Sequence, residues 1–153
     1  ETAIHRFAAD HPRALIVVDH LDHVEVGGRV ESQVVAIATI MRRLKAAALA
    51  AKVPMLLVAQ FNRGFEGDRR PGLHDLKGGS AIEQYADSVW LLHHPDDEAP
   101  RWATLAVAKN RRGPRADCHL DHDLEHTRFS ERQGEQRTWT TTKQTPSHKP
   151  SSA

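Results

Sequence analysis

Apolar and polar positions form blocks along the chain, and their period changes from one block to the next. Residues 14–19 and 55–60 are uninterrupted apolar runs that each end in a polar residue. Such runs are typical of strands covered on both faces, as in a parallel sheet. Residues 29–52, which lie between them, repeat every three or four positions and predict one helix with a single buried stripe. That stripe comprises Val30, Val34, Ile37, Met41, Leu44 and Ala48.

Strand, helix and strand in this order predict a right-handed βαβ unit. Further along, residues 80–86 suit a short helix, and residues 88–92 and 102–108 are two more apolar strands. Polar and apolar residues alternate over 116–121 and 126–129, which predicts antiparallel strands at a sheet edge. The predicted fold class is therefore α/β, with a mainly parallel sheet flanked by helices and antiparallel strands at its C-terminal edge.

The connecting segments differ in length and composition. Residues 61–76 form a long polar loop rich in Gly, Arg and Asp, and loops of this length are usually functional or mobile. Residues 95–101 suit a surface turn. Residues 131–153 are mostly Gln, Thr, Ser, Lys and Pro, so we expect a disordered tail after a domain that spans 1–130. The first residues lack an initiator Met and suit the end of a helix cut from a longer protein.

Size and composition narrow the class of protein. A chain of 153 residues is long enough for one domain with a real core. Its formal net charge of +1 is too small to identify a nucleic-acid partner, so the placement of the cations matters more than their sum. The single cysteine, Cys118, excludes an internal disulfide and suits a reducing cytosol. No apolar run approaches the roughly 20 residues of a membrane span.

Polar side chains follow the ends of three predicted strands. Asp19 and Gln60 end the first two apolar runs, and Lys109 and Arg111 follow the run 102–108. The i, i+2 spacing places both cations on the same face of an extended strand, where they repel each other unless an anion lies between them. Phosphate is the natural candidate for that anion, and a solvated surface pair is the alternative.

A cluster of potential metal ligands lies near the C-terminal end of the domain. On a strand, neighbouring members of this cluster face opposite sides and cannot converge as four tetrahedral ligands without a bend. We therefore expect no metal there. The cluster consists of Cys118, His119, Asp121, His122, Asp123 and His126.

A series of short motifs occurs in order between about residues 10 and 130. They are Leu15-Ile16-Val17-Val18-Asp19-His20-Leu21, Gln60-Phe61-Asn62-Arg63, Arg70-Pro71, Asp75-Leu76-Lys77, Ala81-Ile82-Glu83-Gln84, Ala86-Asp87, Lys109-Asn110-Arg111-Arg112-Gly113-Pro114 and Thr127-Arg128-Phe129. Each motif alone is weak, but the ordered set is fairly specific. It resembles the C-terminal RecA-type motor domain of the DnaB family, the ring-shaped replicative DNA helicases.

This resemblance implies a RecA-like P-loop NTPase core with ATP and Mg²⁺ as ligands. Asp19, at the end of the Walker B strand, would hold Mg²⁺ through bound water. Gln60 would sense the γ-phosphate of the same nucleotide. Lys109 and Arg111 would reach the γ-phosphate of ATP bound by the neighbouring subunit, where an arginine finger is worth roughly 10³–10⁵ in rate.

The resemblance also implies a DNA-binding surface in the ring channel. Arg63, Lys77 and the glycines Gly78 and Gly79 would contact the phosphates of single-stranded DNA, because glycine lets backbone N–H groups approach a phosphate closely. A solvated loop of mixed charge is the alternative for part of this segment. We expect Arg63 to contribute more than Arg69 or Arg70, which are interspersed with acidic residues.

The chain departs from the family pattern at three places. His20-Leu21-Asp22 stands where the family has Tyr-Leu-Gln, and Lys77-Gly78-Gly79-Ser80 stands where it has Arg-Glu-Ser-Gly. The second change removes a carboxylate from a DNA-facing loop. A Gly-x-x-x-x-Gly-Lys-Ser/Thr phosphate loop is absent from the 153 residues. We therefore expect that this polypeptide alone does not hydrolyse ATP.

The resemblance implies a replicative helicase that couples ATP hydrolysis at subunit interfaces to movement along single-stranded DNA. The implied assembly is a homo-hexamer in the cytoplasm, associated with the nucleoid, with primase and a helicase loader as further partners. Two alternatives stay open at this point. One is a RepA-like plasmid or phage ATPase, or a primase-fused helicase; the other is a non-catalytic DNA-binding paralogue.

Overall fold

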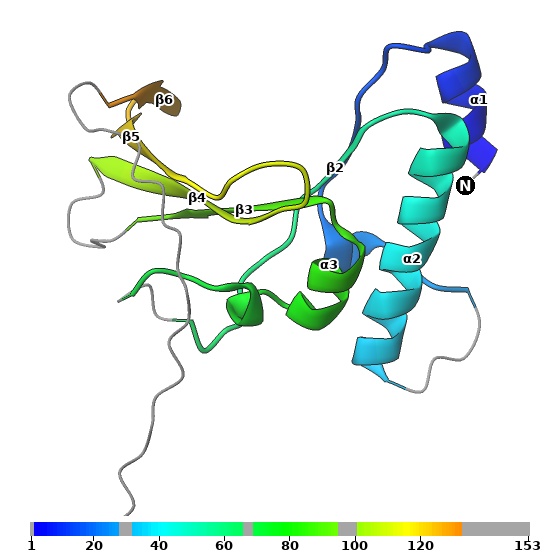
Figure 1. Ribbon diagram of the computed structural model, residues 1–153, viewed down its shortest axis with the longest axis horizontal. Helices are drawn as coiled ribbons and strands as arrows, with labels where there is room; N and C mark the ends of the chain where they lie inside the picture. Colours follow the sequence, from blue (N-terminus) through cyan, green and yellow to red (C-terminus); the bar gives the residue numbers. More distant parts are fainter. Residues whose placement is uncertain (1, 28–31, 66–68, 95–100, 133–153) are drawn as a thin grey trace, which may run out of the picture.

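The computed structural model describes residues 2–27, 32–65, 69–94 and 101–132. Its helices are α1 (Thr2–Asp10), α2 (Gln33–Ala51) and α3 (Gly79–Tyr85), with the 3₁₀ turns η1 (Leu21–His23) and η2 (Leu73–Asp75). Its strands are β1 (Ile16–Val18), β2 (Met55–Leu57), β3 (Ser88–His93), β4 (Trp102–Asn110), β5 (Asp117–Asp123) and β6 (Arg128–Glu131). Helices α2 and α3 pack against each other, and the β3–β6 sheet extends away from them (Figure 1).

The predicted strand–helix–strand unit is confirmed. Strands β1 and β2 pair in parallel with Ile16 opposite Met55, and α2 connects them. Helix α2 starts at Gln33 rather than at residue 29, because the side chain of Ser32 caps it by accepting a hydrogen bond from the Val35 amide at 3.3 Å. The helix ends at Ala51, and its C-cap residue Lys52 adopts a left-handed conformation.

The prediction of a mainly parallel sheet is wrong for the described residues. Only β1 and β2 pair in parallel there, whereas β3, β4, β5 and β6 form a four-stranded antiparallel sheet in sequence order. The physical reason is the length of the connections: residues 94–101, 111–116 and 124–127 link successive strands. Each link is shorter than the dozen or so residues that a parallel crossover needs. The two C-terminal strands are antiparallel, as predicted.

The buried face of α2 differs in part from the predicted stripe. Ile37 and Met41 are buried as predicted, whereas Val34 is 67% exposed. Ile40 and Ala47, which the stripe omitted, are buried. The helix packs against both α1 and α3, so its buried surface is wider than one stripe. Val30 lies outside the described residues, as do most of the predicted surface turn and the predicted tail beyond Arg132.

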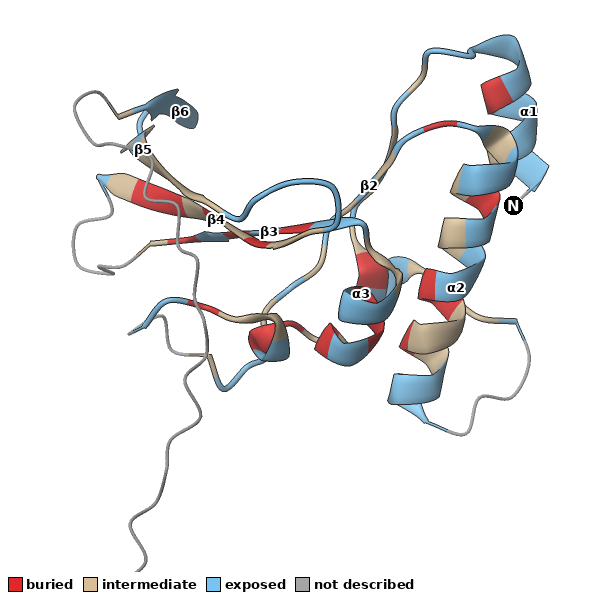
Figure 2. Cartoon of the chain, viewed as in Figure 1, coloured by how far each residue is buried: buried red, intermediate tan, exposed pale blue. Residues whose placement is uncertain are grey.

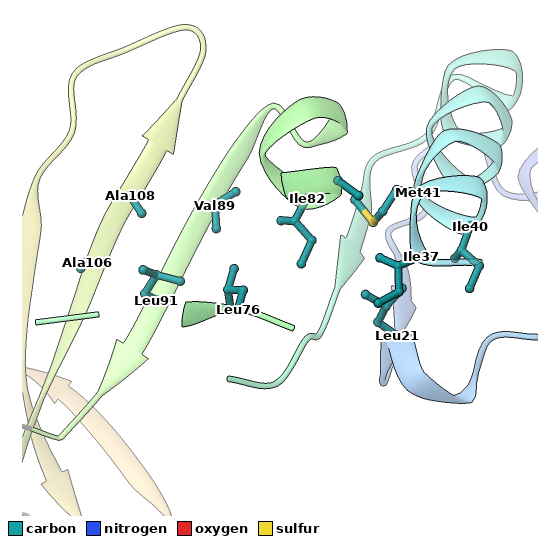
Figure 3. Close-up of a cluster of buried hydrophobic side chains, with 11 residues drawn as sticks. Leu21, Ile37, Ile40, Met41, Leu76, Ile82, Val89, Leu91, Ala106 and Ala108 are labelled. Atoms are coloured by element: carbon teal, nitrogen blue, oxygen red, sulfur yellow. The ribbon is translucent and has the colours of Figure 1, made fainter. Parts of the chain in front are cut away.

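The hydrophobic core lies between the helices and one face of the antiparallel sheet (Figure 3). Leu91 of β3 and Ala106 of β4 are fully buried, and Ile82 of α3 packs with them. Met41 of α2 and Leu21 of η1 extend the same cluster toward β1. Burial of each large apolar side chain contributes about 1.5–3 kcal/mol. The core therefore fixes α2, α3 and η1, which border the predicted site residues.

The parallel strands are covered on one face only within the described residues. Val17 of β1 is 55% exposed and Leu56 of β2 is 41% exposed, and Leu15 and Val58 are also exposed. Figure 2 draws exposed residues in pale blue, among them positions of β2 and β3. The prediction that both strands are covered on both faces is thus wrong for the part of the chain that the structure describes.

Candidate functional site

The ends of β1 and β2 adjoin, and Asp19 and Gln60 lie at this edge. The Val58 amide donates to the Val18 carbonyl at 2.9 Å, and the Leu21 amide donates to the Val58 carbonyl at 2.9 Å. These bonds continue the parallel pairing past the last residue of each strand. Asp19 and Gln60 are both exposed. The structure therefore brings the predicted carboxylate and amide to the same edge of the parallel pair.

The loop that follows Gln60 returns to the same edge. Phe61 forms an antiparallel bridge with Leu76, and the Lys77 amide donates to the Gln60 carbonyl at 3.0 Å. The Asn62 amide donates to the Asp75 carbonyl at 2.7 Å. The backbone of Lys77, a predicted DNA contact, is thus bonded directly to the residue predicted to sense the nucleotide.

The side chain of Lys77 reaches the other strand end. Its Nζ lies 2.8 Å from Oδ2 of Asp22, which belongs to the turn that follows β1. The hydrogen bond from Lys77 is the largest cause that lowers the pKa of the Asp22 carboxyl. Burial has a smaller effect and raises this pKa, and the charge of the Lys77 ammonium lowers it further. Lys77 therefore contacts the segments after both parallel strands.

Gly78 and Gly79 are fixed by packing. Gly78 has a φ of 79°, and a Cβ added there would lie 2.6 Å from Cγ2 of Ile37. A Cβ at Gly79 would lie 2.1 Å from the carbonyl oxygen of Leu73, and its own amide donates to Leu76 at 2.9 Å. Steric fit thus explains both glycines without DNA, and the Gly79 amide is already used within the chain.

Two arginines of the long polar loop are held by carboxylates. Arg69 donates to both oxygens of Asp75 at 2.8 and 2.6 Å, and Arg70 donates to both oxygens of Asp117 at 2.9 and 2.5 Å. The hydrogen bond from Arg69 is the main cause that holds the pKa of Asp75 far below its usual range. Arg63 is exposed, and no described residue forms a hydrogen bond or ion pair with its guanidinium. The expectation that Arg63 contributes more to DNA contact than Arg69 or Arg70 stays a prediction.

Lys109 and Arg111 are directed toward α3 and the turn after it. Lys109 Nζ donates to the carbonyl of Glu83, and Arg111 Nη1 lies 3.3 Å from Oδ1 of Asp87. The Arg111 amide also donates to the Asp87 carbonyl at 2.9 Å. Because Asp87 supplies an anion within the chain, repulsion between the two cations does not by itself require a phosphate.

Asp87 belongs to the Ala86-Asp87 motif, which by itself indicated neither a role nor a partner for this carboxylate. Its carboxylate also accepts a hydrogen bond from Lys45 of α2, and this bond is the largest cause that lowers the pKa of Asp87. The signal in the sequence is weak, since a carboxylate before a strand predicts nothing about partners 42 and 24 positions away. The carboxylate joins α2 to the end of β4.

The residues at the strand edge fit a magnesium ion bound mainly through water. Mg²⁺ usually keeps several waters and binds one or two carboxylates together with substrate phosphates. Asp19 offers an exposed carboxylate for such a water shell, whereas Asp22 is already paired with Lys77. Among the described residues there is no group of three or more His, Cys, Asp or Glu side chains that could hold a metal by themselves.

The histidines of the antiparallel sheet have packing partners instead. His122 of β5 stacks on Phe129 of β6 with ring centroids 4.2 Å apart, and His94 stacks on His122 at 5.0 Å. His119 Nδ1 lies 3.2 Å from the Thr104 hydroxyl.

The described helices include none with the length and hydropathy needed to cross a bilayer.

Comparison with known proteins places these features in one family. The family described as the DnaB-like helicase C-terminal domain matches residues 1–131. Replicative DNA helicases DnaB of Mycobacterium intracellulare and Mycobacterium leprae are 37% and 38% identical to this chain over 123 residues, or 76% of it. The DnaB of Leifsonia xyli is 36% identical over 124 residues.

Two solved structures are similar in fold. The first, an ATPase domain, superposes with a TM-score of 0.77 at 26% identity, covering 86% of this chain and 50% of that one. The second, a DnaB-like replicative helicase studied with its interactions with primase, gives a TM-score of 0.74 at 25% identity, covering 84% of this chain and 34% of that one. The chain spans about a fifth of the two mycobacterial relatives, 21% and 20%. On the match over residues 1–131, the chain belongs to the DnaB-like helicase C-terminal domain family.

Proposed function

We propose that this chain is part of the motor domain of an ATP-dependent replicative DNA helicase. The observation that carries the proposal is the edge where β1 and β2 end. Asp19 and Gln60 lie at this edge, and Lys77 contacts the segments that follow both strands. The relatives of this chain are named replicative DNA helicases, and these names do not favour the RepA-like or the non-catalytic alternative.

In this proposal the strand edge serves the nucleotide of its own subunit. Asp19 would hold Mg²⁺ through bound water, and Gln60 would respond to the γ-phosphate. Mg²⁺ would supply charge neutralisation for phosphoryl transfer there. The backbone bond between Gln60 and Lys77 then gives a direct connection between the nucleotide and the DNA-binding loop.

Lys109 and Arg111 serve the nucleotide of the neighbouring subunit in the proposed homo-hexamer. Arg111 remains 54% exposed while paired with Asp87, so its guanidinium can also meet an anion that approaches from outside the chain. Exposed ion pairs of this kind are weak, about 0–1 kcal/mol, and exchange readily. Single-stranded DNA binds at Arg63, Lys77, Gly78 and Gly79, with Gly79 contributing through the shape of the backbone.

The remainder of the ATPase domain completes the nucleotide site. The similar ATPase domain of known structure is about twice as long as the part this chain matches, and β1 and β2 expose an apolar face within the part of the chain that the structure describes. A phosphate-binding segment that packs on this face supplies what the 153 residues lack. Primase and a loader are the further partners, and the cytoplasm near the nucleoid is the location that the proposal implies.

A chimera tests this function. The matching 123-residue stretch of the DnaB of Mycobacterium intracellulare is replaced by that of this chain, and the hexamer is assayed for ATP hydrolysis stimulated by single-stranded DNA. We expect activity in the chimera, and its loss by about 10³-fold or more in Arg111→Ala. Asp19→Asn should also abolish turnover, whereas Asp10→Asn, on the exposed end of α1, should not. An assembled chimera in which Asp19→Asn keeps full activity would contradict the proposal.

A further inference from the structure

Asp22 and Lys77 contact each other although they lie far apart in the sequence. Their side chains form an ion pair of 2.8 Å across 55 positions. A neutral amide in place of the Asp22 carboxylate would lack the charge for such a pair. The pair therefore joins the turn after β1 to the loop that follows β2.

Lys77 is the least firmly held of three paired cations in this region. Arg69 and Arg70 each form two hydrogen bonds to a carboxylate whose side chain is only 7% or 14% exposed. Among the described residues, the ammonium of Lys77 forms one hydrogen bond, to Asp22, and these side chains are 35% and 27% exposed. Bidentate pairs of arginine are stronger and geometrically fixed, whereas an ammonium has three rotatable donors on a flexible stem. Lys77 is thus the cation that can most readily exchange its carboxylate for another anion.

We propose that Asp22 is a positioning residue that competes with a DNA phosphate for the ammonium of Lys77. This inference rests on the proposed DNA-binding function. Without DNA, the Asp22 carboxylate occupies Lys77 and holds it against the turn after β1. When single-stranded DNA binds, a phosphate oxygen takes the place of the carboxylate. Asp22 thereby lowers the affinity of the loop for DNA. It also holds the Lys77 side chain near the edge where β1 and β2 end.

The Lys77–Asp22 ion pair connects the segments that follow β1 and β2, so a change of partner at Lys77 affects both segments. The backbone of Lys77 is bonded to Gln60, and Asp22 lies three residues after Asp19. An exchange of partner at Lys77 therefore changes a contact between the segments that follow both β1 and β2. DNA binding at this loop releases the turn of β1 from Lys77 while the bond to Gln60 stays in place.

The experiment is a double-mutant cycle in DNA binding. Fluorescence anisotropy measures the affinity of the 153-residue chain for a labelled oligothymidylate at several salt concentrations. We expect Asp22→Asn to bind about two- to fivefold more tightly, the range that corresponds to an exposed ion pair. Lys77→Gln should bind more weakly, with a salt slope less steep by about 0.7, as expected for one lost phosphate contact on a single strand. In the Lys77→Gln background, Asp22→Asn should leave the affinity for the oligothymidylate unchanged.

Two controls separate the pair from charge and from folding. Asp10→Asn removes the same charge from the exposed end of α1 and should leave the affinity nearly unchanged. Lys77→Arg keeps the cation and should keep the response to Asp22→Asn. Circular dichroism and thermal melts verify that each variant is folded, and Lys77→Met, which also removes the charge, takes the place of Lys77→Gln in the cycle if that variant unfolds.

The possible outcomes distinguish the proposed DNA-binding function from the proposed competition between Asp22 and DNA for Lys77. If the chain binds DNA and Lys77→Gln weakens it, but Asp22→Asn has no effect or acts equally without Lys77, the competition is wrong and the DNA-binding function stands. If Lys77→Gln binds as the unchanged chain does, Lys77 is not a DNA contact and the competition fails with it. If no folded variant binds oligothymidylate, both the proposed DNA surface and the competition are overturned.

Discussion

Asp87 joins the end of β4 to α2 through Arg111. Arg111 Nη1 lies 3.3 Å from Oδ1 of Asp87, the backbone of the same two residues is hydrogen-bonded at 2.9 Å, and Lys45 donates to the other carboxylate oxygen. The strand that carries the proposed arginine finger is thus held through a carboxylate that also contacts a helix of the core. Its position depends on the fold of the subunit that provides it.

The first prediction concerns this carboxylate. Asp87→Asn should lower the free energy of unfolding by about 0.5–1 kcal/mol at pH 7, because both side chains of the Arg111 pair are about half exposed and solvent screens the charges. The pKa of Asp87 is lowered in the folded chain, so its contribution is present above the ordinary pKa of 3.8 and lost as pH falls below it. Urea unfolding at pH 7 and pH 3 measures both effects. Equal stability of the two proteins at pH 7 would contradict the prediction.

The second prediction concerns Asp75, which is the more firmly held carboxylate. Its side chain is buried, it accepts two hydrogen bonds from Arg69, and the Gly72 amide donates to it at 2.7 Å. Its pKa is strongly lowered, so it stabilises the fold above pH 3.8 and this contribution falls progressively under acid conditions. Asp75→Asn should destabilise the chain more than Asp87→Asn does at pH 7. The difference from the unchanged chain should narrow when urea unfolding is repeated at pH 3.

The sequence predicts those parts of the fold that depend on residues close together in the chain, and it predicts contacts between distant elements less well. The period of residues 29–52 and the capping by Ser32 are local, so the helix could be predicted to within a few residues. The burial of Ile40 in place of Val34 depends on α1 and α3, which no repeat within the helix can reveal. The strands 88–92 and 102–108 were recognisable as strands, but their antiparallel pairing follows from a short connection that apolar composition does not indicate.

The same distinction holds for the candidate site. The placement of Asp19 and Gln60 at one edge could be predicted because the ends of parallel strands joined by a helix adjoin. The partners of Lys77, Arg70 and Arg111 could not, because each ion pair joins residues at least 24 positions apart. Charge repulsion between Lys109 and Arg111 suggested an external anion, which stays a prediction; the structure adds that Asp87 is an anionic partner of Arg111 within the chain.

The third prediction separates packing from DNA binding at the glycines. Gly79→Ala should destabilise the chain by about 3 kcal/mol, because its Cβ would lie 2.1 Å from a backbone oxygen of Leu73 that cannot move without shifting η2. Ser80→Ala, at the next and exposed position of α3, should cost less than about 0.5 kcal/mol. Thermal unfolding without DNA measures both. A folded Gly79→Ala of unchanged stability would show that the close contact does not explain this glycine.

The fourth prediction concerns His93, which is nearly buried on β3. Neither ring nitrogen has a hydrogen-bond partner among the described residues, and burial is the main cause that lowers its pKa. The charge of Arg70 also lowers it, and that of Asp117 opposes this effect. Because the folded chain favours neutral imidazole, the stability that depends on His93 is present above the ordinary pKa of 6.5 and falls as pH drops below it.

The substitution His93→Leu removes this titration and the unpartnered nitrogens. It should raise the free energy of unfolding by about 1 kcal/mol at pH 7.5, and by more at pH 5.5. Chemical unfolding at the two pH values measures the change. His94→Leu, at the neighbouring and less buried position, is the control: its Nδ1 lies 2.9 Å from the Trp102 carbonyl, so its replacement should not raise the free energy of unfolding. A His93→Leu chain that gains nothing at pH 5.5 relative to pH 7.5 would contradict the prediction.

The last prediction tests whether the rest of the ATPase domain covers β1 and β2. Val17→Thr keeps the shape of the side chain and adds a hydroxyl, so its cost reports burial. In the 153-residue chain Val17 is 55% exposed, and the substitution should change stability by less than about 0.5 kcal/mol. In the DnaB chimera, where we propose that a further segment packs on this face, the same substitution should cost about 1–3 kcal/mol. Val89→Thr, at a position that is 8% exposed in this chain, should cost a similar amount in both proteins and so calibrates the comparison. A negligible effect of Val17→Thr in both would show that the face stays open to solvent, and the remainder of the domain would then have to pack elsewhere.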